Sequence, residues 1–554
     1  MDALTKPNGA NSSPLSPVGF LERAAIIYTD SPSIVYNNVT YTWADTFRRC
    51  RKLASSISRL GIGKGDVVSV LAPNIPATYE LHFAVTMTGA VINAINTRLD
   101  ARTVSTLLAH SESKLVFVDY QLIPLIQEAF YLLSDGLVPC PSLVVITDGD
   151  AAAGDHDSPA AASFRTTYES MVEAGDPGFI WVRPKSYWDP LTLMYTSGTT
   201  SSPKGVVHSH HGTFIGTISS LFDWFVPKQP VYLWTLPMFH VSGWNFVWGT
   251  AAVGGTNVCV RKFNASIIYD SIQKFHVTHM CGAPVVLNML TEKLVTHKVH
   301  ILTSGAPPPP AVLLRVESLG FKVTHIYGLT EAGGPATTCA GNKEWDSLAA
   351  SDRARLKARQ GVRSVGMSDV DVVNPESGVS VTRDGLTQGE IVIKGGSVMS
   401  GYLKDPESNT KFIRNGWFYT GDVGVMHPDG YLEIKDRSKD VIISGGENIS
   451  SVEVESILYL HPAVNEAAVV GRPDEYWGEA PCAFVSLKDG DQPGTPRPTA
   501  QDIMKFCKGK LPGYMVPKSV VFKDELPKTS TSKIQKNVLR DIAKTMGFPE
   551  ISRL

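Results

Sequence analysis

The sequence lacks the closely spaced cysteine pairs that hold zinc or cross-link small secreted folds. Its 7 cysteines are an odd number, scattered without a CxxC pair, so we expect reduced, mostly buried thiols in an intracellular protein. His208, His210 and His211 lie close together, but no carboxylate or cysteine stands at a spacing that would complete a zinc site. We therefore predict neither a disulfide framework nor a zinc centre.

An excess of one charge and a long apolar run are also missing. The formal net charge is -2, which offers no electrostatic footprint for nucleic acid or an anionic membrane. No apolar run reaches the roughly eighteen residues that span a bilayer, because polar residues or glycines interrupt the best stretches, 81–95 and 246–260. Residues 1–17 are polar with one basic residue, unlike a secretory signal or an Arg-rich transit peptide. We expect no nucleic-acid partner and no membrane span.

What is present is an alternation of strand-like and helical patterns in a long chain. With 554 residues, of which 43% are hydrophobic and 19% charged, the chain is long enough for roughly three to four domain-sized units. The alternation predicts α/β layers around a mostly parallel sheet. Residues 148–162 are rich in Ala, Gly and Asp, and we expect an exposed loop there. The strand-like runs lie at 34–36, 67–71, 115–118 and 143–146, and the helical patterns at 43–60 and 77–92.

One polar stretch follows a short strand-like run at 191–194. It reads Tyr195-Thr196-Ser197-Gly198-Thr199-Thr200-Ser201-Ser202-Pro203-Lys204-Gly205. Hydroxyls and open backbone N–H groups can surround phosphoryl oxygens, glycine permits close approach, and lysine adds a positive charge. A polar surface turn has a similar composition, but the order is informative. A Walker loop requires Gly-Lys-Ser/Thr, whereas here Pro203 precedes Lys204 and Gly205 follows it, so a kinase or GTPase phosphate loop is disfavoured.

This stretch resembles the phosphate loop of the adenylate-forming superfamily, which includes acyl-CoA synthetases, adenylation domains of peptide synthetases and beetle luciferases. The usual family pattern is Thr-Ser-Gly-Thr-Thr-Gly-x-Pro-Lys-Gly, and Ser201 stands where the family has its second glycine. The resemblance runs in the expected order from about residue 20 to residue 543. In overall character the chain is most similar to plant-type peroxisomal acyl-activating enzymes. The resemblance implies that residues 196–204 bind the phosphates of ATP.

Three further motifs resemble the nucleotide-binding segments of this family. The resemblance implies that the first two are adenine-side turns at strand ends. In the second motif, Tyr327 would stack on the base, Thr330 would reach the α-phosphate, and Glu331 would bind Mg²⁺; a solvated loop carboxylate is the plain alternative for Glu331. In the third, Asp422 would accept hydrogen bonds from both ribose hydroxyls. The motifs read Ser304-Gly305-Ala306-Pro307, His325-Ile326-Tyr327-Gly328-Leu329-Thr330-Glu331 and Gly416-Trp417-Phe418-Tyr419-Thr420-Gly421-Asp422.

A fourth motif points to the acid-binding pocket. It reads Leu236-Pro237-Met238-Phe239-His240-Val241-Ser242-Gly243-Trp244. In the family, an aromatic residue or a histidine of this segment faces the substrate carboxylate, so the resemblance implies this role for His240. A histidine beside Phe and Val is otherwise more often a core residue. By position, the candidates for the pocket wall besides His240 are Ser242, Trp244, Phe246 and Gly328.

The charged run at 436–440 marks the predicted boundary between two domains. We predict a flexible N-terminus over 1–19 and an adenylation domain over 20–435, built of layered α/β subdomains plus a small β region. A small, mobile α+β domain follows over 436–554. The resemblance implies that Asp436 is the hinge of this mobile domain and that Arg437 reaches the nucleotide; a solvated linker is the plain reading of the same charges.

Two motifs of the second domain complete the resemblance. The turn that contains Ser444, Gly445 and Gly446 would lie beside the channel for coenzyme A. The run Pro527-Lys528-Thr529-Ser530-Thr531-Ser532-Lys533-Ile534 resembles the family's terminal lysine motif, with Ser532 at a family glycine. The resemblance therefore implies that Lys533 holds the carboxylate and the α-phosphate together during adenylation; an exposed lysine is the plain alternative.

Together these resemblances predict an ATP-dependent, AMP-forming carboxylate–CoA ligase that needs Mg²⁺ and uses coenzyme A as co-substrate. The favoured substrate is an aromatic acid such as trans-cinnamate or benzoate. The alternatives are a short- or medium-chain fatty acid and, in another class of protein, a catalytically silent sensor of nucleotide or acyl-CoA. The two serine-for-glycine changes motivate the sensor, and the intact Thr330, Glu331, Asp422 and Lys533 oppose it.

The last three residues carry a separate signal. Ser552-Arg553-Leu554 is a conservative variant of the Ser-Lys-Leu peroxisomal address. We expect the peroxisomal import receptor as a partner and the peroxisome, with the cytosol as a second location, as the place of action.

Overall fold

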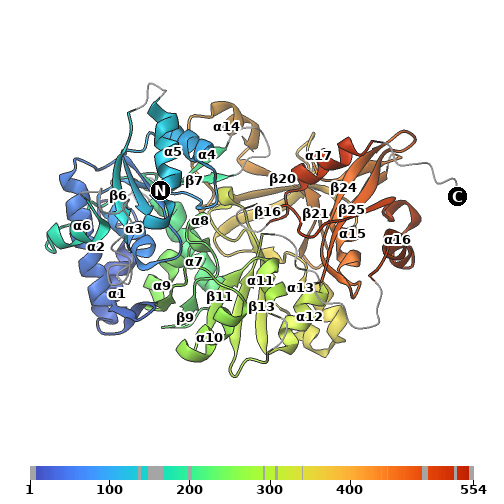
Figure 1. Cartoon of the computed structure of the whole chain (residues 1–554), viewed down its shortest axis with the longest axis horizontal. Helices are drawn as coiled ribbons and strands as arrows, with labels where there is room; N and C mark the ends of the chain where they lie inside the picture. The colour runs from blue at the N-terminus through green and yellow to red at the C-terminus, as the bar shows by residue number, and fades with distance from the viewer. Residues whose placement is uncertain are drawn as a thin grey trace, which may run out of the picture.

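The computed structural model describes most of the chain, and Figure 1 shows its arrangement. The N-terminal elements, blue to green, gather at one end, and the C-terminal elements β24, β25, α16 and α17, orange to red, gather at the other. This is a large N-terminal α/β domain followed by a small C-terminal domain, as predicted. The described residues are 8–134, 139–147, 166–196, 203–290, 293–305, 308, 310–339, 341–437, 439–445, 447–488, 497–529 and 533–547.

Two large sheets form the N-terminal domain. In the 7-stranded sheet, β4, β3, β5, β6 and β7 are parallel to one another, β8 is antiparallel to β7, and β18 pairs antiparallel with β8. In the 9-stranded sheet the central strands are parallel, β2 is antiparallel to β1, β14 is antiparallel to β13, and β15 pairs antiparallel with β14. The order of the first sheet is β18 (Gly401–Tyr402), β8 (Lys204–Ser209), β7 (Pro190–Thr196), β4 (Val91–Ala94), β3 (Val67–Leu71), β5 (Leu115–Asp119) and β6 (Ser142–Ile146). The order of the second is β15 (Val362–Arg363), β14 (Thr337–Thr338), β13 (Phe321–Tyr327), β12 (Val299–Thr303), β11 (His279–Gly282), β9 (Val231–Leu233), β10 (Thr256–Val258), β1 (Pro32–Tyr36) and β2 (Val39–Thr42).

Two smaller sheets follow in the chain. The first is the small β region, in which Asp422 pairs with Arg437 across β20 and β21. The second is the sheet of the C-terminal domain. The small β region contains β16 (Met367–Val373), β17 (Gly389–Gly395), β19 (Ile413–Arg414), β20 (Trp417–Met426) and β21 (Leu432–Arg437). The C-terminal sheet contains β22 (Ile442–Ser444), β23 (Glu447–Ile449), β24 (Val464–Asp474), β25 (Gly478–Leu487) and β26 (Ser519–Phe522).

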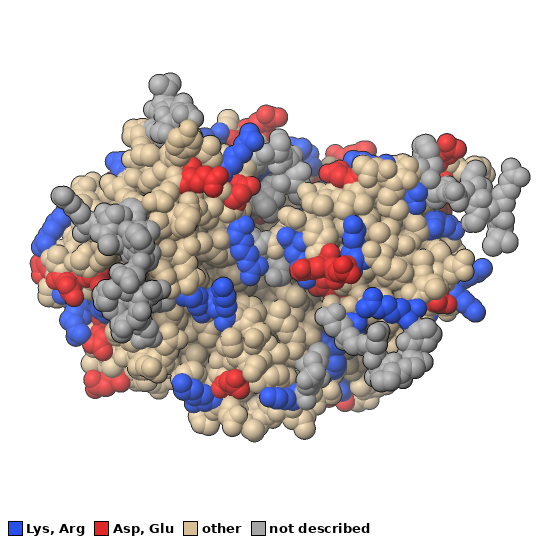
Figure 2. Space-filling model, viewed as in Figure 1, with Lys and Arg blue, Asp and Glu red and all other residues tan. Residues whose placement is uncertain are grey.

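The helices pack around these sheets. The described ones are α1 (Gly19–Ile27), α2 (Trp43–Arg59), α3 (Pro76–Met87), α4 (Ala101–Ser111), α5 (Ile123–Ser134), α6 (Tyr168–Ala174), α7 (His210–Asp223), α8 (Val241–Trp244), α9 (Phe246–Val253), α10 (Ala265–Phe275), α11 (Pro284–Met289), α12 (Pro310–Ser318), α13 (Ala350–Lys357), α14 (Pro406–Phe412), α15 (Ser451–Leu458), α16 (Ala500–Lys508) and α17 (Lys536–Thr545). None of these helices is both long and apolar enough to cross a membrane. On the face in Figure 2, basic and acidic side chains are interspersed, consistent with the net charge of -2.

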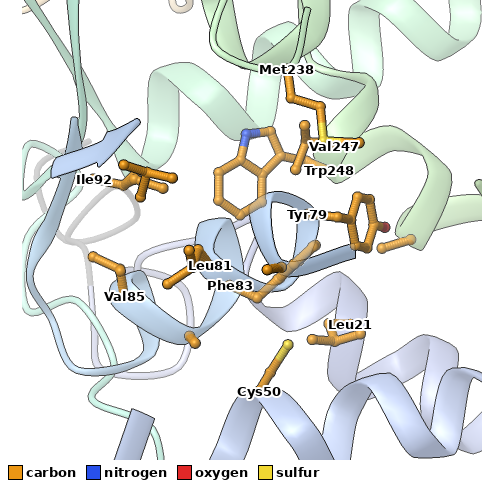
Figure 3. Close-up of a cluster of buried hydrophobic side chains, with 14 of the residues drawn as sticks. Leu21, Cys50, Tyr79, Leu81, Phe83, Val85, Ile92, Met238, Val247 and Trp248 are labelled. Atoms are coloured by element: carbon orange, nitrogen blue, oxygen red, sulfur yellow. The ribbon is translucent and has the colours of Figure 1, made fainter. Parts of the chain in front are cut away.

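Helix α3 lies at the centre of the largest core cluster. Its residues from Ala77 to Met87 are all buried, so it shows no polar face. Figure 3 shows Phe83 of α3 near Trp248 of α9, and the two rings meet edge to face at 4.9 Å. Helices α2 and α6 flank it through an ion-pair network in which Arg49 of α2 contacts Glu80 of α3 and Glu169 of α6. This dense packing makes the N-terminal domain a rigid support for the loops at its strand ends.

Some boundaries differ from the sequence-based expectation. The helix predicted over 77–92 ends at Met87, because Gly89 turns the chain with a φ of +83°, and β4 begins at Val91. The packed domain also begins before residue 20: Val18 is fully buried in the core. All 7 cysteines are free, and all but Cys140 are buried, as predicted. The expected loop at 148–162 lies outside the described residues.

Candidate functional site

The strands that flank the predicted phosphate loop form an antiparallel pair. Thr196 ends β7 opposite Lys204, which begins β8. The Nζ of Lys204 donates a hydrogen bond of 2.6 Å to Ser408 and lies 3.9 Å from the carboxylate of Asp405. Pro203 is partly buried, and the six loop residues before it are outside the described part of the chain, namely Ser197, Gly198, Thr199, Thr200, Ser201 and Ser202.

The predicted metal-binding turn is a single 3-10 turn, Thr330–Ala332, that several segments hold in place. The hydroxyl of Tyr402 donates a hydrogen bond of 2.8 Å to Oε1 of Glu331. Nε2 of His208 donates one of 2.8 Å to the carbonyl of Thr330. Burial raises the pKa of Glu331, and the hydrogen bond from Tyr402 opposes that rise. The carboxylate is therefore held in one orientation by a neutral donor.

This turn suits Mg²⁺ rather than a metal caged by protein. Among the described residues, no three or more His, Cys, Asp or Glu side chains cluster closely enough to hold a metal ion. Mg²⁺ binds proteins through one or two carboxylates and completes its shell with water and substrate phosphates. One fixed carboxylate beside a predicted phosphate site fits that pattern.

A tyrosine, an aspartate and an arginine meet at the predicted ribose position. The hydroxyl of Tyr327 donates a hydrogen bond of 2.7 Å to Oδ2 of Asp422. Nε of Arg437 lies 3.5 Å from Oδ1 of Asp422, and the Arg437 side chain is 50% exposed. Burial raises the pKa of Asp422, with Arg437 and Tyr327 acting in the opposite direction. The second oxygen of Asp422 is thus only loosely paired and open to another hydrogen-bond donor.

Lys533 reaches from the C-terminal domain into the large domain. Its Cε would lie 3.0 Å from a Cβ atom at Gly305, whose φ of +95° also favours glycine. Burial and the positive charge of Arg437 lower the pKa of Lys533 to about 8, while Asp422 and Glu331 act to raise it. Burial, and then the charge of Lys533, lower the pKa of His240 to about 3. Both side chains line the same space.

That space is a small cavity of about 40 Å³. Of the predicted pocket residues, His240 and Trp244 line it; Ser242, Phe246 and Gly328 do not, and Phe246 packs in the core against Trp224 and Tyr232. Leu236, Pro237, Ser304, Gly305 and Lys533 also line it and belong to motifs of the sequence, whereas the other lining residues belong to none. The complete lining is Arg98, Thr235, Leu236, Pro237, His240, Trp244, Phe263, Ala283, Val285, Val286, Ser304, Gly305 and Lys533.

An unusual backbone turn presents Trp244 to this cavity. From Val241 to Asn245, five consecutive residues have φ between 42° and 69°, which makes α8 a left-handed turn. In this conformation the residues other than Gly243 cost roughly 1–2 kcal/mol each. The amide of Asn245 anchors the turn by donating 2.8 Å to the carbonyl of Gly333. The strained turn thus ties the cavity wall to the residues just after Glu331.

The remaining predicted nucleotide residues lie around these groups. His325 is buried in β13 and its Nδ1 donates to the carbonyl of Arg359, which directs the ring to the backbone. Ile326 is also buried in β13. Gly328 lies so close to Gly334 that a Cβ would meet its carbonyl oxygen at 2.5 Å, and Leu329 precedes the Thr330–Ala332 turn. Ala306 and Pro307 are outside the described residues.

The predicted hinge residue connects the two domains. Asp436 is 3% exposed, and its Oδ2 accepts a hydrogen bond of 2.7 Å from the backbone N–H of Ser451, at the start of α15. The predicted CoA-side turn lies apart from the cavity: neither Ser444 nor Gly445 lines it, and the N–H of Gly445 donates 2.8 Å to the carbonyl of Trp477. Gly446 lies outside the described residues.

Comparison with known proteins gives consistent matches over nearly the whole chain. Residues 21–403 match the family model for the AMP-binding enzyme, and residues 453–533 match that for the AMP-binding enzyme C-terminal domain. The chain is 63% identical over 548 residues to the 2-methylpropanoate–CoA ligase CCL4 of Humulus lupulus, covering 98% of this chain and 97% of that protein. It is 60% identical over 554 residues to the probable acyl-activating enzyme 5, peroxisomal, of Arabidopsis thaliana, covering 99% of each.

Among solved structures, the chain resembles the o-succinylbenzoate CoA synthetase (MenE) of Bacillus subtilis in complex with the acyl-adenylate intermediate OSB-AMP. The TM-score is 0.77 and the sequence identity 26%, covering 94% of this chain and 98% of that one.

Proposed function

Since this chain belongs to the AMP-binding enzyme family, we propose that it activates a short aliphatic carboxylic acid of about four carbons. The enzyme is an AMP-forming carboxylate–CoA ligase that works through an acyl-adenylate and uses ATP, Mg²⁺ and coenzyme A. The observation that carries the substrate proposal is the cavity between His240, Trp244 and Lys533, with its volume of about 40 Å³.

The size of the cavity favours a small acyl group. One water-sized group needs roughly 10–15 Å³ of cavity volume. A cavity of about 40 Å³ therefore has room for about three or four non-hydrogen atoms. Leu236, Val285 and Val286 provide apolar walls, which suit a hydrocarbon tail. The relative from Humulus lupulus is named for 2-methylpropanoate, which has three carbons beyond its carboxyl carbon. An aromatic acid such as cinnamate or benzoate stays a sequence-based prediction, and the cavity would have to enlarge to hold one.

In the first half-reaction, a carboxylate oxygen attacks the α-phosphate of ATP and pyrophosphate leaves. Lys533 would bridge the incoming carboxylate and the α-phosphate, and Lys204 would supply positive charge near the leaving group. Asp422 would accept the ribose hydroxyls, with Tyr327 beside it. Glu331, with Thr330 next to it, would hold Mg²⁺, which when bound offsets negative charge on the phosphates. His240 would face the carboxylate as a neutral imidazole, since its pKa lies at about 3.

In the second half-reaction, the acyl-adenylate transfers its acyl group to the thiol of coenzyme A. Lys533 now occupies the same cavity as His240, an arrangement that supports adenylation and not thiol entry. We propose that the C-terminal domain turns about Asp436, withdraws Lys533 and brings the turn of Ser444 and Gly445 to the thiol channel. The proposal includes the bounds of the two domains that move relative to one another, 20–435 and 436–554.

A panel assay tests the substrate. Purified enzyme with MgATP and coenzyme A receives 2-methylpropanoate, butyrate, hexanoate, benzoate or cinnamate separately, and AMP and thioester are measured together. We expect the highest kcat/KM with a four-carbon acid. A higher kcat/KM with benzoate or cinnamate would overturn the aliphatic proposal and favour the aromatic one. Nucleotide binding without AMP formation from any acid would favour the silent sensor.

We also propose peroxisomal import through Ser552-Arg553-Leu554, which lies outside the described residues. Support comes from the tripeptide itself and from the relative whose name includes "peroxisomal". A fluorescent fusion that keeps the free C-terminus should enter peroxisomes, and a fusion lacking residues 552–554 should remain in the cytosol. Equal import of both would overturn the proposed address.

A further inference from the structure

Tyr402 lies at the junction of two parts of the site that are far apart in sequence. It ends the two-residue strand β18, which pairs with β8 just after the phosphate loop, Tyr402 opposite Val206. The N–H of Leu403 donates 2.7 Å to the carbonyl of Gly205, and the N–H of Met399 donates 2.8 Å to the carbonyl of Glu331. The segment 399–403 thus bridges the strand that leaves the phosphate loop and the turn that contains Glu331.

The hydroxyl of Tyr402 holds one oxygen of the Glu331 carboxylate. The bond is 2.8 Å long and joins residues 71 positions apart. Tyr402 is 6% exposed, and Asn409 fixes its backbone on both sides, accepting from its N–H at 2.7 Å and donating to its carbonyl at 3.0 Å. A buried donor on a fixed backbone can keep a carboxylate in one rotamer. The other oxygen, Oε2, is left for a different partner.

The ring of Tyr402 touches the lysine of the phosphate loop. Nζ of Lys204 lies 4.9 Å from the centre of the Tyr402 ring and 4.7 Å from that of Phe412. The same Nζ donates to Ser408 at 2.6 Å. Two aromatic faces and one hydroxyl therefore seat the cation. One tyrosine contacts a predicted phosphate-binding cation with its ring and the predicted metal-binding carboxylate with its hydroxyl.

We propose that Tyr402 is a positioning residue for adenylation, which orients Glu331 toward Mg²⁺ through its hydroxyl while its ring seats Lys204. Carboxylates that bind metals are themselves hydrogen-bonded, and loss of such a partner typically weakens metal binding or activity about 10–100-fold. The inference rests on the proposed roles of Glu331 and Lys204. It adds that the two groups are coupled through one side chain.

Tyr402→Phe tests the hydroxyl alone, because the ring and its contact with Lys204 remain. The readout is the Mg²⁺ concentration that gives half-maximal AMP formation at saturating ATP and acid. We expect this concentration to rise about 10–100-fold, with the maximal rate largely recovered at high Mg²⁺. Thioester formation from a supplied acyl-adenylate should not change, since it needs no Mg²⁺, and it also reports that the variant is folded.

Two further variants serve as controls. Tyr79→Phe removes another buried tyrosine hydroxyl, which lies 3.0 Å from that of Thr250 in the core, and should leave the Mg²⁺ dependence at the wild-type value. Ser408→Ala removes a partner of Lys204 and should raise the KM for ATP without shifting the Mg²⁺ dependence. If Tyr402→Phe is insoluble, a Tyr402→His variant, which keeps a ring with a donor, should fall between wild type and Glu331→Gln in Mg²⁺ dependence.

The outcomes separate this inference from the proposed function. An unchanged Mg²⁺ dependence in Tyr402→Phe, together with impaired adenylation in Glu331→Gln, would overturn the role of Tyr402 only. Normal adenylation and Mg²⁺ dependence in Glu331→Gln would overturn the metal-binding assignment itself. An equal Mg²⁺ shift in Ser408→Ala would show a general disturbance of the segment and would also overturn the inference.

Discussion

Two carboxylates in this enzyme have the same kinds of partner, but the arginine beside one is mostly buried and the arginine beside the other is half exposed. Glu80 in the core and Asp422 at the predicted ribose position each accept a tyrosine hydroxyl, from Tyr168 and Tyr327, and each lies beside an arginine. Arg49 contacts Glu80 at 2.8 Å with its side chain 15% exposed and that of Glu80 fully buried. Arg437 lies 3.5 Å from Asp422 and is 50% exposed.

This difference in pairing distinguishes a structural ion-pair network, whose hydrogen bonds are all made within the protein, from a carboxylate that can still accept a ligand. Arg49 also binds Glu169 with two hydrogen bonds, of 2.7 and 3.0 Å, so the core network ties α2, α3 and α6 together. Asp422 can still accept a further hydrogen bond, and the side chain of its partner Arg437 is exposed enough to move into solvent. A buried ion pair with complete hydrogen bonding resists change, whereas a loosely paired carboxylate can exchange its partner for a substrate hydroxyl.

The largest effect is expected from Lys533, the residue that the C-terminal domain contributes to the candidate site. Lys533→Ala should reduce acid-dependent AMP formation about 10²–10³-fold, because it removes a charge aimed at the transition state. Thioester formation from supplied acyl-adenylate should change far less, since Lys533 would have left the site by then. Stopped assays of the two half-reactions provide the measurement. Equal losses in both would contradict the proposed division of labour.

Matched amide substitutions of Glu80 and Asp422 test whether the first carboxylate is structural and the second binds ATP. Glu80→Gln should lower the free energy of unfolding by about 3 kcal/mol, because it leaves Arg49 without its buried partner. Asp422→Asn should cost less stability than Glu80→Gln, because Arg437 is half exposed and can turn to water, yet raise the KM for ATP about 10–100-fold through loss of charged hydrogen bonds. Denaturant melts and ATP titrations measure the two effects. A large stability loss with unchanged ATP binding in Asp422→Asn would make that carboxylate structural as well.

Two tryptophans distinguish the filled core from the cavity that we propose to hold the acyl group. Trp248→Ala should destabilise the fold by about 3–5 kcal/mol without altering acid preference, because Trp248 is fully buried beside α3. Trp244→Ala enlarges the cavity that Trp244 lines, so the preference for hexanoate over 2-methylpropanoate should rise about 10-fold or more. The ratio of kcat/KM values measures this. An unchanged ratio would show that Trp244 does not limit acyl length.

The smallest effect concerns pH. The pKa of Lys533 is lowered to about 8, so the lysine is charged below that pH and neutral above it. Because kcat/KM reports the free enzyme, kcat/KM for ATP in adenylation should fall as pH rises through about 8. Thioester formation from supplied acyl-adenylate should lack this alkaline limb. An adenylation profile that stays flat to pH 10 would contradict the requirement for a charged Lys533.

Much of the fold was predictable because its signals are local. The strands at 67–71 and 115–118 and helix α2 were predicted from strand-like runs and a helical pattern, and the structure adds a capping box at Thr42 that starts α2. Helix α3 was harder, because it is buried all round and carries no amphipathic period, so its end at Met87 depended on the turn at Gly89. The motifs around Thr330, Asp422 and Lys533 stand out by residue order, although their roles stay predictions.

The contacts between motifs could not be predicted from the sequence, because they join segments that are far apart in the chain. Tyr402 and Glu331 are 71 residues apart, and nothing in their local sequence indicates that they meet. Ser242 and Phe246 alternate with His240 and Trp244 in sequence, yet the left-handed turn at Val241–Trp244 leaves only the latter pair at the cavity. The sequence by itself determined the order of the motifs and the chemistry that each can offer, because that information lies in neighbouring residues. The tertiary structure decided the size of the cavity beside Lys533, the loose pairing of Asp422 with Arg437 and the link through Tyr402, because each depends on packing between distant segments.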